Sequence, residues 1–309
     1  MCDNERSKFS EIATVIIFIS LFSACKQKTD WGSIRVIKEN EQITDVILEN
    51  DLIKVKYANE TVTGWASRQP VCIVEFLYKK ISTNFAQNGR FDDMLDPVDH
   101  ETHKPKIQHR KKLLDASIVY DGPDKKTVHL KWETSEEKVT LFRDSPVLQI
   151  DYLRWYVLIT DWPNWPQGPE AYKEQMYAIY GADQWHRTYD PHDTTRQSGL
   201  AYDDIYFDRK PSDQHKQKGI LDPRDGGPLS YKGWFIVGAY KTLTGYGFAR
   251  VVPVERVNAL VLWKWRAWEF CFDGEGTITT YLYPVSDGAD EIISVGKSIA
   301  DKNPLKGSR

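Results

Sequence analysis

Short segments of alternating apolar and polar residues, separated by turn sequences, recur along this chain and constrain its fold more than any other feature. Four of them follow in quick succession, at residues 117–120, 127–132, 138–143 and 147–156. Turn-forming Gly, Pro, Asp and Ser lie between them at residues 121–124 and 144–146. A period of two is typical of half-buried strands. Closely spaced strands with few helical segments indicate an antiparallel β-sandwich rather than a parallel α/β sheet.

The same pattern predicts strands on both sides of this region. Further strands are expected within residues 43–57, at 71–78 and, four or five in number, between 234 and 283. Residues 81–112 lack this periodicity and are expected to form a long excursion without regular structure, which is often functional. Only Asp290 to Ala300 has apolar residues at helical spacing. We therefore predict an all-β protein, a large antiparallel β-sandwich with long loops and a short C-terminal helix.

The length of the chain bounds its domain organisation. A chain of 309 residues, 41% of them hydrophobic, can bury a sizeable core in one large β domain or in two ordinary ones. The sequence contains no internal repeat, low-complexity segment or interdomain linker. We predict a single catalytic β-sandwich domain at residues 34–309, preceded by a tether at residues 25–33.

The first thirty residues have the features of a targeting segment. Residues 12–22 form an apolar run that is too short to span a bilayer. The small residues directly before Cys25 resemble the bacterial lipoprotein signal, in which this Cys is lipidated and becomes the new N-terminus. Phe22 and several acidic residues depart from that signal, and a buried N-terminal helix is the alternative. The resemblance implies a signal peptide at residues 1–24 and a lipid anchor on Cys25 as the one membrane contact. It also implies a location in the periplasm or on the outer membrane or cell surface.

Charge and cysteine content exclude several classes of function. The formal net charge of −3 provides no global field that would attract nucleic acid, so no nucleic-acid partner is predicted. After Cys25, the body of the chain contains Cys72 and Cys271, for which a disulfide and two buried thiols are both compatible with the sequence. No Cys/His pattern has the spacing of a metal site.

Residues 177–207 form the stretch that carries most chemistry. Its aromatic and basic members include Trp185, His186, Arg187, Tyr189, His192, Arg196, Tyr202 and Tyr206, with five Asp residues between them. A groove that binds an anionic sugar uses this mixture, because rings stack on pyranose faces, Arg pairs with a carboxylate, and His and Tyr transfer protons. The alternative is a long loop that its aromatic residues hold on the sandwich.

Two strand-forming segments of the sequence resemble segments of known carbohydrate-active proteins. Glu49 to Val55 resembles the opening strands of galactose-mutarotase-like and lyase sandwich domains, and Leu141 to Tyr152 resembles a strand-turn-strand found further along them. The resemblance implies a mutarotase-like, lyase-like or jelly-roll sandwich in a lipoprotein of a bacterial polysaccharide-utilisation system. Lyases and oligosaccharide dehydratases that act on uronate polysaccharides such as ulvan are of this kind. No catalytic position matches residue by residue.

The chemistry that this resemblance implies is β-elimination, in which the proton α to a uronate carboxylate is removed and the group at C4 leaves. The reaction needs a base, an acid and a cation for the carboxylate. We expect His186 to be the base, Tyr189 or alternatively Tyr246 to be the acid, and Arg187 or Arg196 to bind the carboxylate. The other residues predicted to bind the anionic oligo- or polysaccharide are Trp185, His192, Tyr202 and His215.

Other candidates have weaker patterns. The spacing of His100, His103 and His109 fits no recognised metal motif, and the acidic residues Asp92, Asp93, Asp96 and Asp99 lack the spacing of an EF-hand loop. We predict no metal site and no cofactor, and leave a structural or catalytic divalent metal such as calcium open. His129 alternates with apolar neighbours and is expected to be a structural residue on a strand face. Trp263 and Trp265 form either a stacking platform or part of a core face.

Two other functions fit the same residues. A glycoside hydrolase on the same scaffold would use paired carboxylates, although no pair stands out. A glycan-binding lipoprotein without catalytic activity would use the aromatic faces and would need none of the histidines. Products with a C4–C5 double bond would distinguish an eliminating enzyme from both.

Overall fold

The computed structural model describes most strands of the chain and its C-terminal helix. The described residues are 31–58, 72–87, 90–95, 112–133, 135–153, 158–163, 175–180, 204–208, 230–262, 268–272 and 276–305. The chain divides into two compact units, residues 1–31 and 32–309, and the fold set out below is that of the second unit.

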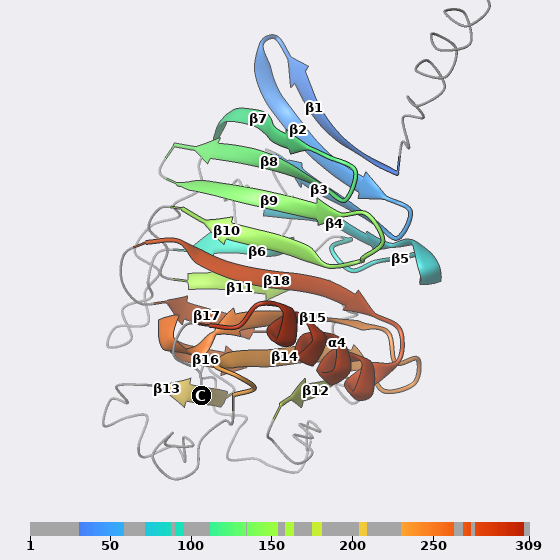
Figure 1. The fold of residues 1–309 in the computed structure, drawn as a ribbon, viewed down its shortest axis with the longest axis vertical. Coiled ribbons are helices and arrows are strands. Elements are labelled where there is room, and N and C mark those ends of the chain that lie inside the picture. The colour runs from blue at the N-terminus through green and yellow to red at the C-terminus, as the bar shows by residue number, and fades with distance from the viewer. Residues whose placement is uncertain are drawn as a thin grey trace, which may run out of the picture. The chain divides into compact units, whose positions relative to one another are not determined.

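Two antiparallel sheets form this unit (Figure 1). The described part of the first sheet has ten strands, in the order β1 (Gly32–Glu39), β2 (Gln42–Asn50), β3 (Ile53–Ala58), β4 (Cys72–Tyr78), β6 (Arg90–Leu95), β11 (Leu158–Trp162), β17 (Trp268–Phe272), β16 (Val257–Leu262) and β13 (Asp204–Asp208), with β5 (Thr83–Asn84) beside β4. The second has eight, in the order β12 (Gln175–Ile179), β14 (Trp234–Lys241), β15 (Gly247–Pro253), β18 (Ile278–Val285), β10 (Leu148–Tyr152), β9 (Glu136–Phe142), β8 (Lys125–Trp132) and β7 (Leu113–Asp121). Two short 3-10 helices, η1 (Lys79–Ile81) and η4 (Val254–Arg256), follow β4 and β15. The predicted all-β antiparallel sandwich is therefore confirmed.

The alternation seen in the sequence corresponds to burial in the structure. On β8, Val128, Leu130 and Trp132 have no more than 1% of their surface exposed, whereas Lys131 between them is exposed. Such a strand places one set of side chains between the sheets and the other set toward solvent. Because the period of two is local, the sequence predicted β7 to β10 within a few residues of their bounds.

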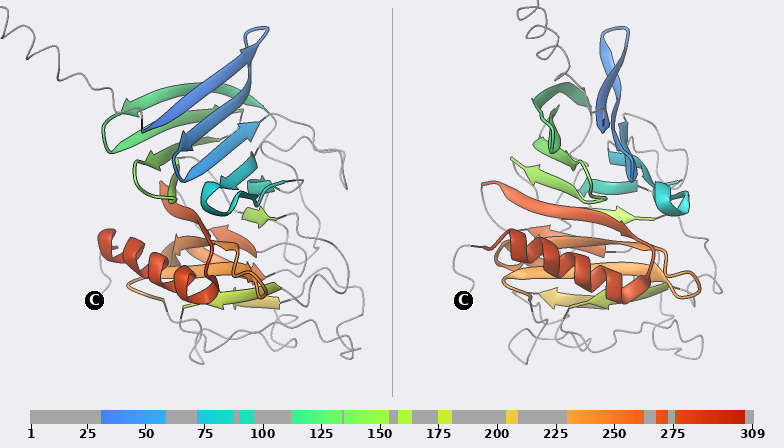
Figure 2. Two further views of the ribbon diagram at one scale, coloured as in Figure 1. Left: turned by 90° about the vertical axis from the view of Figure 1, so that its right-hand side faces the viewer. Right: turned by 45° about the vertical axis from the view of Figure 1, so that its right-hand side comes forward.

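A second core lies outside the sandwich, under the helix α4 (Gly288–Lys302). Figure 2 shows α4 across the outer face of the sheet that contains β14, β15 and β18. Ile292 and Ile299 of the helix pack there against Ile236 and Val251 of the strands. The predicted helix at residues 290–300 is thus confirmed, and it extends by two residues at each end.

The two segments that resemble carbohydrate-active proteins, Glu49 to Val55 and Leu141 to Tyr152, are joined by the buried side chain of Asn50. Asn50, 2% exposed, donates from Nδ2 to the carbonyl oxygens of Phe142 (2.7 Å) and Ser145 (3.0 Å). Its Oδ1 accepts the backbone N–H groups of Leu52 and Ile53, both at 2.8 Å. Asn50 therefore joins the β2–β3 turn of one sheet to the β9–β10 turn of the other.

Two predictions need correction, and one alternative that the sequence left open is decided. Residues 81–112 were expected to lack regular structure, yet β6 lies within them; its Asp92 is fully buried, so the strand shows no apolar alternation. The predicted tether reaches Ser33, but β1 begins at Gly32. Cys72 on β4 and Cys271 on β17 are separated by β6 and β11, and three strand spacings of about 4.8 Å place their Cα atoms roughly 14 Å apart. A disulfide between them, which requires Cα atoms within about 7 Å, is excluded in this fold.

No helix among the described residues is long and apolar enough to cross a membrane. The predicted signal peptide at residues 1–24 and the predicted anchor Cys25 lie outside the described residues.

Candidate functional site

Of the predicted site residues, the structure describes Tyr246. The others lie outside the described residues: Trp185, His186, Arg187, Tyr189, His192, Arg196, Tyr202 and His215. The same holds for His100, His103, His109, Trp263 and Trp265. The described strands nevertheless fix where the segments that contain several of these residues leave the sandwich.

Tyr246 lies in the turn between β14 and β15, with a half-buried side chain. Its backbone N–H donates to Thr244 Oγ1 (3.2 Å), and its carbonyl oxygen accepts the Lys241 N–H (3.0 Å). The preceding Gly245 has a φ of 70°, a conformation that favours glycine, and its carbonyl oxygen accepts the Gly288 N–H at 2.9 Å. The turn that carries Tyr246 is therefore attached to the first residue of α4.

Four strand ends form one row across the first sheet. Asp204 pairs with Leu262, Leu262 with Trp268, and Trp268 with Asp161. We call these four positions the strand-end row. β13 begins at Asp204, β16 ends at Leu262, β17 begins at Trp268, and β11 ends one residue after Asp161.

β11, which ends at the strand-end row, runs toward the side of the fold on which Tyr246 lies. In the first sheet, β4 ends on the side where β11 ends, because both are antiparallel to β6. Lys80, in the η1 helix that follows β4, donates to the Oγ of Ser286, the residue after β18, at 3.0 Å. The end of β18 pairs with Gly247, the residue after Tyr246. Asp161 of the row itself contacts Arg250, which lies four residues after Tyr246 on β15.

The strongest polar arrangement among the described residues lies between the sheets and shares Asp161 and Trp268 with the strand-end row. We call it the buried ion cluster. Its members, all with 0% of their surface exposed, are Arg250, Asp161, Asp92, Tyr152, Trp268 and Thr280. Arg250, Tyr152 and Thr280 come from the second sheet, and the other three from the first. Side chains from both sheets thus meet in one network.

Asp161 is the acceptor at the centre of the buried ion cluster. Arg250 donates to it through Nε (2.5 Å) and Nη2 (2.7 Å), a two-pronged pairing. Trp268 Nε1 donates at 2.7 Å and the backbone N–H of Asp92 at 3.0 Å. Four donors therefore surround one carboxylate, which compensates its removal from water.

Asp92 and Tyr152 complete the cluster. The Tyr152 hydroxyl donates to Asp92 Oδ1 and accepts from Arg250 Nη1 at 3.0 Å, and Arg250 Nη2 lies 3.6 Å from Asp92 Oδ1. Nη1 also donates to Thr280 Oγ1 at 3.1 Å. The φ of Asp92 is 58°, a left-handed conformation that costs free energy in a residue other than glycine and that the surrounding contacts maintain.

The electrostatics follow from burial and proximity. Burial, together with the nearby charge of Asp92, raises the pKa of Tyr152 well above its ordinary value, so the phenol stays neutral. Burial lowers the pKa of Arg250, but Asp161, Tyr152 and Asp92 together raise it well above its ordinary value, and the guanidinium remains charged. Since no member is exposed to solvent, we interpret the cluster as a clamp between the sheets rather than a place where a ligand reacts.

The sequence analysis missed this cluster. Its signal was present: Arg250 is the only charged residue in the otherwise apolar strand Gly247–Pro253. Asp92, considered above as a possible calcium ligand, instead faces Tyr152 and Arg250. Among the described residues, no group of three His, Cys, Asp or Glu side chains is arranged to hold a metal ion.

Two weaker candidates have structural positions. His129 Nε2 lies 3.3 Å from Glu136 Oε2 of the neighbouring strand, on the outer face of β8 and β9, as the prediction of a face residue requires. Trp268, near the predicted Trp platform, is a fully buried core residue. Its ring packs 5.1 Å from that of Phe248 across the sandwich.

No protein-family model and no curated protein match the sequence. An alpha-N-acetylgalactosaminidase from Bifidobacterium bifidum aligns with a TM-score of 0.49 and 7% identity over 83% of this chain and 38% of its own. The periplasmic domain of YidC from Thermotoga maritima aligns with a TM-score of 0.39 and 8% identity over 87% and 94%. A putative aldose 1-epimerase from Klebsiella pneumoniae aligns with a TM-score of 0.38 and 7% identity over 90% and 88%. The chain spans 38% and 50% of the lengths of the galactosaminidase and of a full YidC insertase.

Proposed function

We propose that this protein is a carbon–oxygen lyase that acts on a uronate-containing oligo- or polysaccharide, of which ulvan is an example. The observation that carries the proposal is the composition of residues 185–202, where His, Tyr, Arg and Trp gather within eighteen positions. β-Elimination needs a base, an acid and a cation for the carboxylate, and this segment contains all three kinds of side chain.

The strand-end row supports a shared location for the binding groups. Tyr202 precedes Asp204 of the row by two residues, and Trp263, Lys264, Trp265 and Arg266 connect its members Leu262 and Trp268. Trp165 follows Asp161 by four residues. Three segments rich in aromatic residues thus begin or end on adjacent strands, as a groove for a sugar chain requires.

Each role follows from ordinary side-chain chemistry. His186 takes the proton at C5 because an imidazole titrates near neutral pH. Tyr189, or Tyr246 on the β14–β15 turn, gives a proton to the leaving oxygen at C4, and Arg187 or Arg196 neutralises the uronate carboxylate. Trp185, His192, Tyr202 and His215 contact the neighbouring sugar units. The product is a 4,5-unsaturated uronate, formed by cleavage of the chain or by loss of water.

The setting of this activity is part of the proposal. A lipid anchor on Cys25 would hold the enzyme in the periplasm or at the outer membrane or cell surface, where polysaccharide fragments are met. Globomycin treatment of expressing cells, which blocks lipoprotein signal cleavage, would leave an uncleaved precursor. Normal processing in its presence would count against the anchor.

The test is absorbance of the unsaturated uronate while the protein is offered uronate polysaccharides and their oligosaccharides. Growth of this band, followed by mass spectrometry of the products, would establish elimination and separate cleavage from dehydration. Cleavage without the band would indicate a glycoside hydrolase, and binding without cleavage a glycan-binding protein.

The role of His186 has its own test. His186→Ala should lower turnover by about 100-fold or more, the usual loss for a missing general base, while thermal unfolding stays unchanged. His129→Ala, on the outer face of β8 beside Glu136, is the matched control and should keep full turnover. Full activity in His186→Ala would move the base to His192 or His215.

A further inference from the structure

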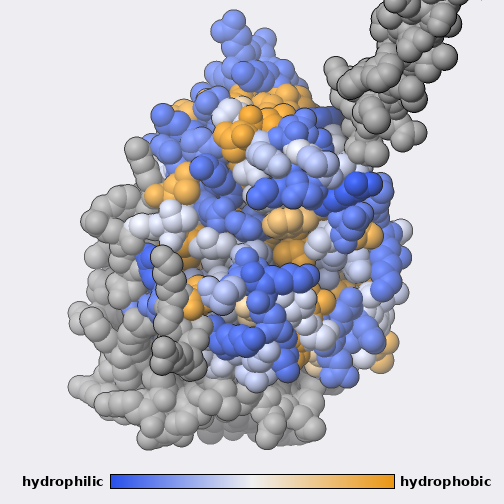
Figure 3. Space-filling view, in the orientation of Figure 1, coloured by the Kyte–Doolittle hydropathy of each residue, from blue (hydrophilic) through white to orange (hydrophobic). Residues whose placement is uncertain are grey.

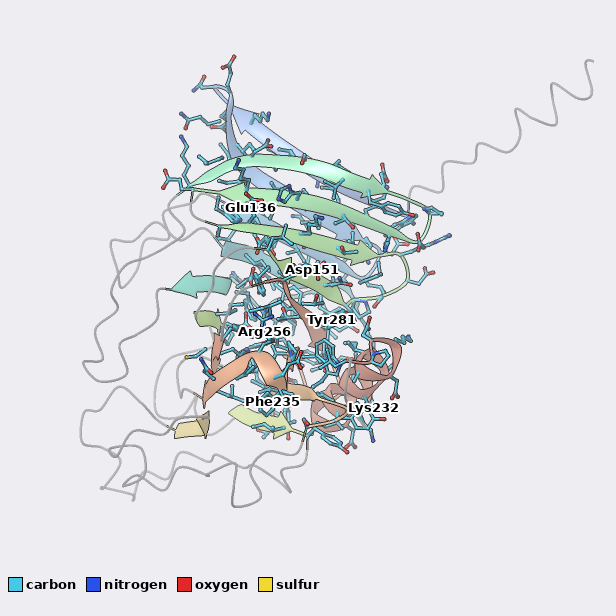
Figure 4. All side chains as sticks on the ribbon, turned by 60° about the vertical axis from the view of Figure 1, so that its left-hand side comes forward. Glu136, Asp151, Lys232, Phe235, Arg256 and Tyr281 are labelled. Atoms are coloured by element: carbon cyan, nitrogen blue, oxygen red, sulfur yellow. The ribbon has the colours of Figure 1, made fainter. Side chains whose placement is uncertain are left out.

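A second group of ionisable and aromatic side chains lies away from the strand-end row. We call it the tyrosine–lysine cluster; its members are Tyr180, Tyr231, Lys232, Lys297 and Asp301. Tyr180 follows β12, Tyr231 and Lys232 precede β14, and Lys297 and Asp301 lie in the last two turns of α4. Figure 4 shows Lys232 beside the helix. Three elements that are distant in sequence thus converge on one surface position.

The two rings form the floor of the cluster. Tyr180 and Tyr231 meet edge to face, with ring centroids 5.2 Å apart. The backbone N–H of Tyr180 donates to the Ile236 carbonyl oxygen (3.1 Å), and the Tyr231 N–H donates to that of Trp234 (3.0 Å). Both rings are half-buried, so each is held in place while part of it faces solvent.

Each of the two ammonium groups lies over a tyrosine ring of the cluster. Lys297 Nζ is 5.1 Å from the Tyr231 centroid and 5.6 Å from the Tyr180 centroid, and Lys232 Nζ is 5.5 Å from the Tyr231 centroid. Asp301 accepts from Lys232 Nζ (2.5 Å) and from the Tyr231 hydroxyl (3.0 Å). The cluster therefore contains two cations and one carboxylate.

Attachment of α4 to the sheet does not require the second cation. Ile292 and Ile299 bury the apolar face of the helix, and Trp234 Nε1 donates to the Asn303 carbonyl oxygen at 3.0 Å. Asn303 also satisfies the last helical carbonyl groups, with its N–H 3.1 Å from the Ile299 oxygen. The helix end is thus already fixed, and Lys297 contributes a positive charge at a place where one carboxylate already has its partner.

We propose that the tyrosine–lysine cluster is an accessory subsite for an acidic unit of an oligosaccharide. The carboxylate of the sugar binds between Lys232 and Lys297, and its pyranose ring packs against the exposed part of the two tyrosines. This inference rests on the proposed function, because it assigns a second contact to the same class of substrate.

Geometry and exposure fit this role. The side chains of Lys232 and Asp301 are 52% and 45% exposed, so a ligand can reach them. An ammonium group has three N–H donors, and Lys232 uses one for Asp301 and keeps two for a ligand. Partly desolvated ammonium groups next to a fixed aromatic surface bind an anionic sugar more strongly than isolated surface lysines do.

The test is calorimetric binding of an oligouronate hexasaccharide to wild-type protein and to Lys297→Met and Lys232→Met. Each substitution keeps the length of the aliphatic chain and removes the charge, and each should weaken binding by about tenfold. A hexasaccharide with carboxyl groups reduced to alcohols should bind all three proteins equally. Lys131→Met, an exposed lysine on β8, is the matched control and should bind as the wild type does.

Further binding experiments identify the chemical group of the ligand that the cluster recognises. Lys297→Arg, which keeps the charge, should bind within about threefold of wild type. A glycan that carries sulfate groups but no carboxylate should compete only weakly with the oligouronate; equal competition would overturn the assignment to carboxylate. Unchanged oligouronate affinity in both Met variants, with unchanged thermal unfolding, would overturn the subsite itself.

Kinetics separate this inference from the proposed lyase activity. If the protein eliminates, the Met variants should raise KM and leave kcat unchanged, since the cluster is not assigned to proton transfer. Wild-type protein that binds oligouronate through these lysines but produces no unsaturated product would refute the lyase and leave the subsite intact. Turnover with normal KM in both variants would refute the subsite and leave the lyase intact.

Discussion

At the scale of single residues, the interior of this sandwich contains charges that most interiors exclude. Arg250, Asp161 and Asp92 are fully buried, and each gains hydrogen bonds that replace those to water. A buried ion pair adds little net stability compared with a well-packed apolar pair, but removal of one partner leaves a charge without compensation. We therefore interpret the buried ion cluster as a device that specifies how the two sheets face each other.

The first prediction concerns this cluster. Asp161→Asn should lower the free energy of unfolding by about 3–5 kcal/mol, because the buried Arg250 loses the charge that neutralises it. Urea denaturation measures the difference. Arg35→Gln, which breaks an exposed pair with Glu49, should change stability by less than about 1 kcal/mol. An equally small effect of Asp161→Asn would show that Arg250 has other compensation.

A second prediction concerns alkaline pH. Burial, together with the nearby charge of Asp151 on the adjacent strand, raises the pKa of Tyr281 to about 12 (Figure 4). The folded state therefore holds this proton more tightly than the unfolded chain, whose tyrosine titrates near 10. Stability from Tyr281 is fully present below pH 10 and is lost as pH rises toward 12. Burial likewise raises the pKa of Tyr152 and Tyr283, so the free energy of unfolding of the whole protein should fall as the pH rises.

The measurement is the free energy of unfolding from pH 8 to pH 12. Tyr281→Phe should reduce the fall by up to about 2–3 kcal/mol, the value of two pKa units. Tyr120→Phe, on the exposed strand β7, should leave the curve unchanged. Parallel curves for wild type and Tyr281→Phe would contradict the assignment.

At the scale of elements, the contact between α4 and the second sheet depends on two glycines. A Cβ atom at Gly296 of the helix would lie 2.3 Å from Cγ2 of Ile236, and one at Gly238 of β14 would lie 2.5 Å from Cδ1 of Ile292. Each glycine thus faces an isoleucine of the other element. The close approach allows the second core to pack at interior density.

The third prediction follows from this contact. Gly296→Ala should destabilise the protein by about 1–3 kcal/mol, because the strain of an added methyl group in a packed core exceeds the roughly 1 kcal/mol gained in helix propensity. Ser298→Ala, at an exposed position of the same helix, is the control and should be neutral or slightly stabilising. Thermal unfolding of the two variants measures the difference. A Gly296→Ala variant more stable than the wild type would mean that α4 moves away from the sheet at little cost in free energy.

At the scale of the whole sandwich, one open edge is unusually apolar. Four of the six exposed large apolar side chains among the described residues lie on the edge strand β7: Leu114, Ile118, Val119 and Tyr120, at 44–50% exposure. Figure 3 shows apolar surface near the upper end of the view, where Figure 1 places β7 and the β1–β2 hairpin. Two register shifts, at Leu113/Asp115 and Ile118/Tyr120, interrupt the pairing of β7 with β8. Such bulges oppose pairing with another chain.

The fourth prediction concerns this edge. Val119→Lys should reduce aggregation on heating or at high concentration without lowering the unfolding temperature by more than a few degrees, since the side chain is half exposed and charges on an edge strand oppose intermolecular pairing. Light scattering during a thermal ramp measures the effect. Leu243→Lys, at a turn outside the edge, should change aggregation less; equal effects of both would remove the special role of β7.

The sequence by itself determined the local pattern. The alternation in β8, the turn residues between β7 and β10, and the helical spacing of Ile292 and Ile299 each depend on neighbours a few positions away, so they were predicted close to their observed bounds. β6 was missed because the same local rule fails where a strand directs Asp92 into a polar interior.

Only the tertiary structure decided which distant residues meet. Arg250 and Asp161 are 89 positions apart, and Tyr231 and Asp301 are 70 apart. The sequence marks Arg250 as a charge in an apolar strand but does not identify its partner, and Tyr231 and Asp301 look like a loop tyrosine and a surface charge. The order of strands in the two sheets sets these contacts, and that order follows from the combined burial of all strands rather than from any local segment. The same order separates Cys72 from Cys271 by two strands, which no count of cysteines reveals.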